Sequence, residues 1–147
     1  MILVRVQAEP LDLAPLLPEG GDTGAVVTFT GFVRGDANEL GGLVSLTLDH
    51  YPAMTERALA AIAAEAERRW PILAGRVVHR VGRMLPGEAI VHVAVASSHR
   101  AAAFAAAEFL MDWLKTKAPF WKAEERAGGT TWVEARASDD LAAARWE

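Results

Sequence analysis

Residues 88–117 read EAIVHVAVASSHRAAAFAAAEFLMDWLKTK and contain the change of pattern that decides the fold. Across 88–96, alanine and valine recur at every second position, which is the period of a β-strand. Residues 99–117 are rich in alanine, the strongest helix former. Ser97 and Ser98 stand between the two patterns, where a hydroxyl is expected to cap a helix. The stretch therefore predicts a strand followed directly by a long helix.

Similar patterns predict the remaining elements. Strands are expected at residues 1–7, 24–33, 43–50, 76–81, 120–126 and 130–135, with helices at 51–70 and at about 138–146 and one or two helical turns at 11–17. A turn at Gly128 and Gly129 joins the last two strands into a C-terminal hairpin. We therefore predict one domain, residues 1–147, of the α+β class, with a mixed, largely antiparallel sheet and two main helices packed on it.

Composition excludes several classes of protein. The chain has 147 residues, 52% of them hydrophobic, which fits one globular domain. Its formal net charge of −4 argues against general nucleic-acid binding, which requires a basic surface. No apolar run is long enough to span a membrane, and no basic segment followed by an apolar block suggests a signal peptide. We therefore expect a cytoplasmic protein that binds neither nucleic acid nor membrane.

The chain has no cysteine, which excludes disulfides, thiolate metal sites and a cysteine nucleophile. Its four histidines are not spaced as metal ligands are in HxH or HxxxH motifs, so we expect no metal site and no other cofactor. His79 and His92 are assigned to packing. If sulfur chemistry takes place here, the sulfur must arrive on a partner or a small molecule.

The long helix has an unusual face. Arg100, Phe104, Met111 and Lys115 fall within about 60° of one another on a helical wheel. Two interpretations remain open. The apolar side chains are buried while both cations reach solvent beyond them, or the cations belong to a functional surface. A cation near a helix C-terminus, such as Lys115, is also favoured by the helix dipole alone.

Other cations also allow two interpretations. Lys122 shares a strand face with Phe120, so it is either a partly desolvated amine or an ordinary exposed lysine. His99 and Arg100 begin a helix, where backbone N–H groups attract anions, so they form either a phosphate site or a solvated pair. Arg34 ends a strand, and either reaches into a pocket or lies at a solvated edge.

Five blocks of sequence, in this order, carry a family resemblance: GAVVTFTGFVR, LDHYPAMTE, HRVGRMLPGEAIVHVAVASSHRAAAF, FLMDWLKTKAPFWKAE and WVEARASD. Over nearly its whole length the chain resembles the large, catalytic subunit of molybdopterin synthases. The resemblance implies an α/β hammerhead-like fold. It also implies a sulfurtransferase reaction, in which cyclic pyranopterin monophosphate receives two sulfurs and becomes the dithiolene of molybdopterin.

The resemblance further implies the partners and the site. The sulfur donor is a small ubiquitin-like carrier subunit with a thiocarboxylate on its C-terminal Gly-Gly, and a homodimer of the large subunit forms the core of a heterotetramer. Matched position by position, the catalytic residues are Lys115 and Lys122. The substrate-binding residues implied in the same way are Phe29, Arg34, His99, Arg100, Met111 and Arg136.

Geometry adds one hypothesis about the dimer. Arg100 and Lys115 lie on one helix, about 22 Å apart at 1.5 Å per residue, which is too far for both to hold one small pterin. We therefore expect each pocket to combine Lys115 and Lys122 of one chain with His99 and Arg100 of the other. The alternative function is a non-catalytic adaptor that binds a ubiquitin-like protein or a phosphorylated pterin without turnover. A hydrolytic enzyme is disfavoured, because no serine lies in a GxSxG motif.

Overall fold

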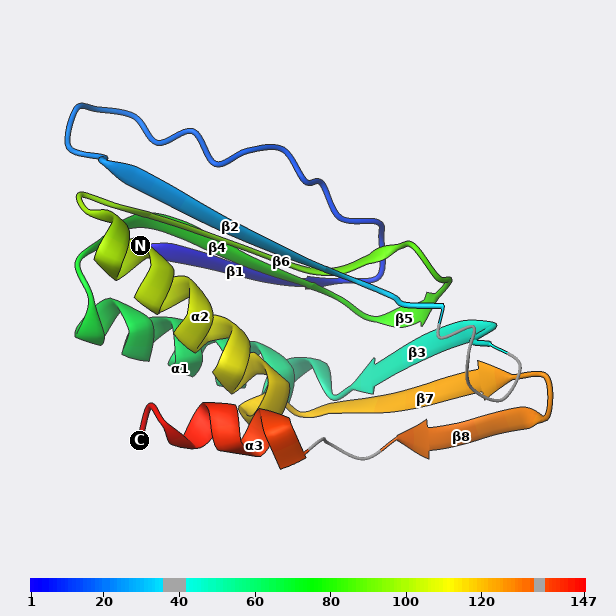
Figure 1. Cartoon of the computed structure of the whole chain (residues 1–147). Helices are drawn as coiled ribbons and strands as arrows, with labels where there is room; N and C mark the ends of the chain where they lie inside the picture. The colour runs from blue at the N-terminus through cyan, green and yellow to red at the C-terminus, as the bar shows by residue number, and fades with distance from the viewer. Residues whose placement is uncertain (36–41, 134–136) are drawn as a thin grey trace.

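The structure, a computed structural model, describes residues 1–35, 42–133 and 137–147. Within these ranges it contains eight strands and three helices (Figure 1). In chain order they are β1 (Ile2–Gln7), β2 (Ala25–Phe32), β3 (Ser45–His50), α1 (Pro52–Arg69), β4 (Ile72–Arg80), β5 (Gly82–Met84), β6 (Ala89–Ser97), α2 (Arg100–Lys117), β7 (Phe120–Arg126), β8 (Gly129–Val133) and α3 (Ala137–Ala144).

The strands form two sheets of four. The main sheet has the order β1-β4-β6-β2, in which β1 and β4 are parallel and the other neighbours are antiparallel. The second sheet has the order β5-β3-β7-β8 and is antiparallel throughout. The predicted α+β class and C-terminal hairpin are confirmed, but the strands are divided between two sheets where one was expected.

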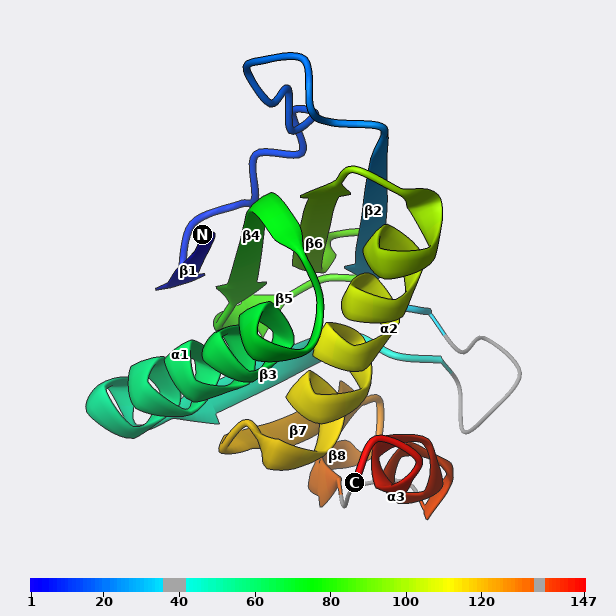
Figure 2. The ribbon, with the colours of Figure 1, turned by 90° about the vertical axis from the view of Figure 1, so that its left-hand side faces the viewer.

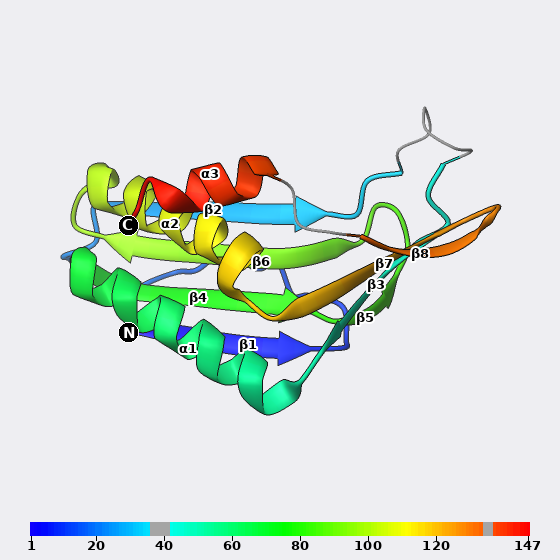
Figure 3. The same cartoon turned by 90° about the horizontal axis from the view of Figure 1, so that it is seen from below.

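The division occurs at the end of β4. Gly82 has a φ of 89°, a left-handed conformation that glycine adopts without steric cost, and the chain turns there from the main sheet into β5 of the second sheet. The expected strand at residues 76–81 ended before this glycine, and the short strand β5 that follows it was not predicted. Figure 3 shows the second sheet leading away from one end of the main sheet.

Both long helices cover one face of the main sheet (Figures 1 and 2). The core between them contains Val91, Val93 and Val95 of β6, together with Leu59 of α1 and Phe109 of α2. The alternation along residues 88–96 thus has the predicted consequence, since every second side chain enters this core. A smaller core under the second sheet contains Val33, Leu46, Leu48, Val81 and Met84.

The helical turns expected at residues 11–17 are absent, and the segment is irregular. Pro15 cannot donate a backbone hydrogen bond, and the Asp12 carboxylate accepts one from the Ala14 N–H, which favours a turn over a helix. The segment instead crosses the sheet face opposite the helices (Figure 1). It is held there because the Arg76 guanidinium donates to the Ala14 carbonyl.

A close backbone approach at Gly24 fixes the chain just before α2. The Gly24 N–H donates to the Ser97 carbonyl at 3.0 Å, and a Cβ on Gly24 would overlap the Ser98 carbonyl oxygen. We expect Gly24→Ala to lower the free energy of unfolding by about 1–3 kcal/mol, as overpacked sites do, measured by urea denaturation. Gly21→Ala is the matched control, because Gly21 has open space around it; its effect should stay within about 0.5 kcal/mol. Equal stability of the two variants would contradict the close approach.

Candidate active site

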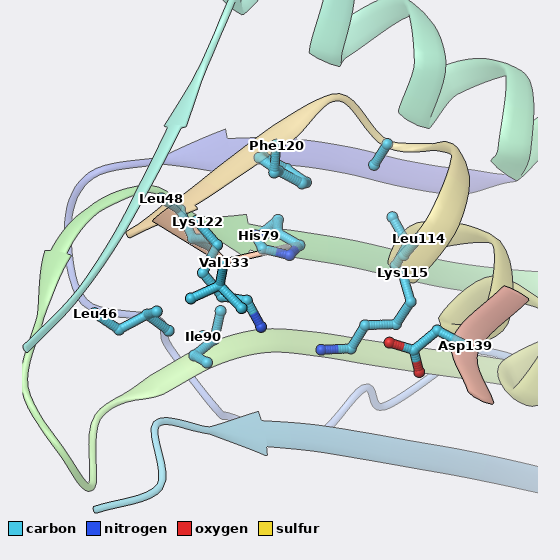
Figure 4. Close-up of a pocket in the computed structure, with 11 residues that line it drawn as sticks. Leu46, Leu48, His79, Ile90, Leu114, Lys115, Phe120, Lys122, Val133 and Asp139 are labelled. Carbon is cyan, nitrogen blue, oxygen red and sulfur yellow. The ribbon is translucent and has the colours of Figure 1, made fainter. Parts of the chain in front are cut away.

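A cleft opens where the C-terminal end of α2 meets the second sheet (Figure 4). Its inner part is a hollow of about 140 Å³ with both apolar and charged lining residues. An adjoining hollow of about 180 Å³ shares Lys115, Lys122 and Asp139 with it. The inner lining consists of Leu46, Leu48, His79, Ile90, Leu114, Lys115, Ala118, Phe120, Lys122, Val133 and Asp139. Residues from seven different elements therefore form one cleft.

Lys115 reaches the cleft because of its position in the last turn of α2. Its neighbour Leu114 is buried, which fixes the rotation of the helix. Lys117, two residues further on, is directed elsewhere: its amine lies 4.5 Å from the Trp113 ring centroid and 3.6 Å from a Glu147 carboxylate oxygen. Of these two lysines, only Lys115 lines the cleft.

Lys122 comes from the middle of β7, where it pairs with Leu48 of β3 and Val133 of β8. Strand alternation places it on the same face as Phe120, as predicted, and both line the cleft. Trp121, between them, faces away and contacts the Tyr51 ring at a centroid distance of 4.9 Å. Figure 4 shows the side chains of Lys115 and Lys122 pointing toward one another across the cleft.

Arg34 lines the adjoining hollow with both lysines. Its position follows from Val33, which is buried and whose N–H donates to the Glu88 carbonyl at 2.9 Å. The guanidinium is exposed at the rim. The prediction that Arg34 reaches a pocket together with the two lysines is therefore consistent with the geometry of the described residues.

A third hollow, of about 500 Å³, lies between β2 and α2 and is lined by Phe29, Phe104, Met111 and Lys115 among others. Lys115 lines both this hollow and the cleft. The hollow lined by Phe29 and Met111 therefore adjoins the cleft at that lysine. Phe29 is 43% exposed and Phe104 61% exposed in the single chain. The apolar side chains of this face are therefore left uncovered by the chain itself.

The remaining predicted residues do not join the cleft. His99 is the N-cap residue of α2 and Arg100 its first residue, at the opposite end of the helix from Lys115, and both are exposed. The expected serine cap is wrong, because no side chain caps this helix and the Ser97 hydroxyl donates to the Pro71 carbonyl at 2.7 Å. Arg136 lies outside the described residues.

Two ionisable residues of the inner cleft were not among the predicted site residues. His79 was assigned to packing; it is buried but also lines the cleft, with its ring stacked on Phe120 at a centroid distance of 4.2 Å. Asp139 was expected only as part of a helix at about residues 138–146, yet it lines both the inner and the adjoining hollow from the first turn of α3. Alternation along β4, which places His79 on the same face as Val77, was the available signal for His79.

Burial is the main cause that lowers the pKa of His79 to about 4, and electrostatic repulsion from Lys115 and His50 contributes to the same shift. A hydrogen bond between Nδ1 and the Arg80 carbonyl, at 3.0 Å, acts in the opposite direction but is outweighed. The imidazole is consequently neutral at neutral pH. The cleft therefore combines two lysine amines with an uncharged aromatic base.

The described residues contain neither a metal-binding cluster nor a membrane-spanning helix. No group of three or more His, Cys, Asp or Glu side chains in the described part of the chain is arranged to hold a metal ion. No helix within the same residues is both long and apolar enough to cross a membrane.

Comparison with known proteins identifies the family. The family model described as MoaE protein matches residues 6–117. The molybdopterin synthase catalytic subunit of Pseudomonas aeruginosa is 53% identical over 150 aligned residues, which cover 98% of each chain. The MoaE protein of Burkholderia ambifaria superposes with a TM-score of 0.79 at 46% identity, covering 99% of this chain and 98% of that one. Molybdopterin synthase from Staphylococcus aureus gives a TM-score of 0.79 at 30% identity, with 88% and 95% coverage. On this evidence the chain belongs to the MoaE protein family of molybdopterin synthase catalytic subunits.

Proposed function

We propose that this chain transfers sulfur from the C-terminal thiocarboxylate of a small ubiquitin-like carrier to cyclic pyranopterin monophosphate, which forms the dithiolene of molybdopterin. The observation that carries the proposal is the convergence of Lys115 and Lys122 in one cleft. Two sulfurs are required for each pterin, so each product needs two loaded carriers in succession.

The cleft suits a thin anionic tail. Leu46, Leu48 and Phe120 give it apolar walls, and a Gly-Gly terminus has no side chains that would collide with them. The thiocarboxylate at the tip of such a tail carries a negative charge, which the lysine ammonium groups attract. The exposed end of Lys115 lies where the cleft joins the hollow lined by Phe29 and Met111, so the tail and the pterin can approach it from different sides.

The reaction needs charge stabilisation and proton transfer. In each round the thiocarboxylate sulfur forms a bond to a carbon of the pterin side chain and a C–O bond at that carbon breaks. The oxygen leaves on the phosphate when the cyclic phosphate opens, and as water in the other round. Water then adds to the acyl carbon and the acyl C–S bond breaks, so that the carrier leaves as a carboxylate and the sulfur remains on the pterin. Lys115 stabilises the negative charge that develops at the acyl oxygen. Lys122 transfers the proton needed when the cyclic phosphate opens.

Apart from Lys115 and Lys122, Arg34 is the only cation that lines the two hollows of the cleft among the described residues, so the substrate phosphate needs further cations. His99 and Arg100 lie fifteen or more residues before Lys115, which corresponds to about 22 Å along α2. A second copy of the chain, related by a two-fold axis, would place its own helix start at this cleft and complete both pockets at once. The exposed apolar side chains Val26, Phe29, Phe32 and Phe104 on β2 and α2 support such packing. With one carrier bound at each cleft, the assembly is a heterotetramer.

The role of Lys115 is tested by Lys115→Ala. We expect the rate of molybdopterin formation to fall about a hundredfold to a thousandfold, the usual effect of removing one group that stabilises developing charge. The measurement incubates the protein with thiocarboxylated carrier and cyclic pterin and follows the product by mass spectrometry. Lys117→Ala is the matched control on the same helix turn, and should change the rate by no more than about twofold, because exposed ion pairs contribute little.

Two results would contradict this assignment. Normal turnover by Lys115→Ala would remove the proposed role of that amine. Carrier binding without any product from the unaltered protein, and with no effect of lysine substitution on binding, would instead favour a non-catalytic adaptor.

Sharing of pockets between two chains is tested by mixing inactive variants. Lys115→Ala and Arg100→Ala chains are unfolded together, refolded at equal concentration and assayed for product. About half of the dimers then contain one chain of each kind, and each of these has one intact pocket, so about a quarter of wild-type activity should return. Each variant refolded alone is the control. If the mixture is no more active than the variants refolded alone, the pockets are not shared.

A further inference from the structure

His79 lies at the floor of the cleft but has no part in the proposed reaction so far. Its side chain is 8% exposed, and its ring stacks on Phe120 with an interplanar angle of 25°. The stack fixes the plane of the imidazole, since Phe120 is itself held in β7 opposite His50 of β3. A buried, oriented polar ring in a cleft with two lysines is a candidate for a specific role.

The hydrogen bond at Nδ1 determines which ring nitrogen of His79 carries the hydrogen and which one can accept a hydrogen bond. Nδ1 lies 3.0 Å from the Arg80 carbonyl oxygen, which can only accept, so Nδ1 carries the hydrogen. Nε2 of the neutral ring therefore has a lone pair and is an acceptor. Among the described residues, no hydrogen bond to this nitrogen is formed within the chain.

The ring keeps this acceptor at neutral pH. Burial holds the pKa of His79 near 4, and the charge of Lys115 acts in the same direction. The titratable groups around it are Lys115 of α2, His50 of β3, Lys122 of β7 and Asp139 of α3. Lys115 and His79 line the same hollow, and the charge of Lys115 acts on the His79 ring.

We infer that His79 is a positioning residue: when the carrier tail is inserted, its Nε2 accepts a hydrogen bond from the Lys115 ammonium and thereby aims that amine at the acyl group. An ammonium has three N–H groups, so one can be held by His79 while others contact the tail or neighbouring side chains. Lysine has a flexible four-carbon chain, and a fixed acceptor reduces the number of positions its amine occupies. The inference rests on the proposed function of the cleft.

A spectroscopic test reads the hydrogen bond without any activity measurement. In the full-length protein at neutral pH, ¹H–¹⁵N correlation of the histidine rings should show His79 with a protonated Nδ1 and an unprotonated Nε2. In the complex with the carrier, Lys115→Met, which replaces the amine with an unbranched apolar chain, should shift the Nε2 resonance more than the Nδ1 resonance. A proton on Nε2, or an Nε2 resonance that moves no more than Nδ1, would overturn the inference.

A kinetic test separates positioning from packing. His79→Phe keeps an aromatic ring against Phe120 but has no acceptor, whereas His79→Gln offers an amide oxygen at a similar reach. We expect His79→Phe to slow single-turnover product formation about tenfold to a hundredfold, the effect of a misplaced reacting group, while the carrier Kd stays unchanged. His79→Gln should recover most of the rate. A wild-type rate for folded His79→Phe, or equal losses in both variants, would overturn the role.

The two proposals fail in different ways. Full activity of Lys115→Ala would remove the proposed function of the cleft, whatever His79 does. A strong loss in Lys115→Ala combined with no loss in His79→Phe would leave the cleft function in place and remove only the role of His79.

Discussion

The position of α2 on the main sheet is the constraint on which the site depends. Ala103, Ala106 and Ala107 are buried on its sheet-facing side, and their small side chains allow the helix to lie close to β6 and β2. A helix held along its whole length acts as a rigid rod, so the places of its two ends are fixed together. One end brings Lys115 to the cleft, and the other carries His99 and Arg100 about 22 Å away. If His99 and Arg100 bind the substrate phosphate as proposed, one chain carries the two parts of the site too far apart for one small pterin, and a second chain is needed to bring them together.

The cleft itself results from the division of the strands into two sheets. β4 ends at Arg80 and β5 begins at Gly82, so His79 is among the last residues of the main sheet before the chain turns. Side chains from both sheets face the space at this turn, and α3 borders it. The Arg145 guanidinium of the C-terminal segment contacts Glu108 at 2.6 Å and Asp112 at 2.7 Å, which docks that segment on α2 and places Asp139 beside the lysines.

Local patterns predicted most elements, because each pattern is a direct consequence of which side chains enter the core. The alternation before Ser97 and the alanine-rich run after it correspond to β6 and α2, and strand alternation correctly placed Lys122 beside Phe120. The division into two sheets was not predictable in this way, since it depends on the conformation of Gly82 and on pairing between distant strands. The same holds for His79, whose burial fits packing equally well; only the arrangement of neighbouring elements places Lys115 near it.

The charges of the cleft fit a carrier that must bind and leave twice for each pterin. The loaded tail ends in a thiocarboxylate and the spent tail in a carboxylate, and both are anions. A permanent cation in place of His79 would strengthen binding of both by similar amounts, and uniform binding of this kind does not accelerate the chemical step. A neutral imidazole beside Lys115 orients an N–H group of the ammonium. Because the imidazole carries no charge, it does not strengthen the attraction between the cleft and the carboxylate of the spent tail. Burial of His79, which keeps its ring uncharged, therefore favours both accurate placement of the amine and release of the carrier.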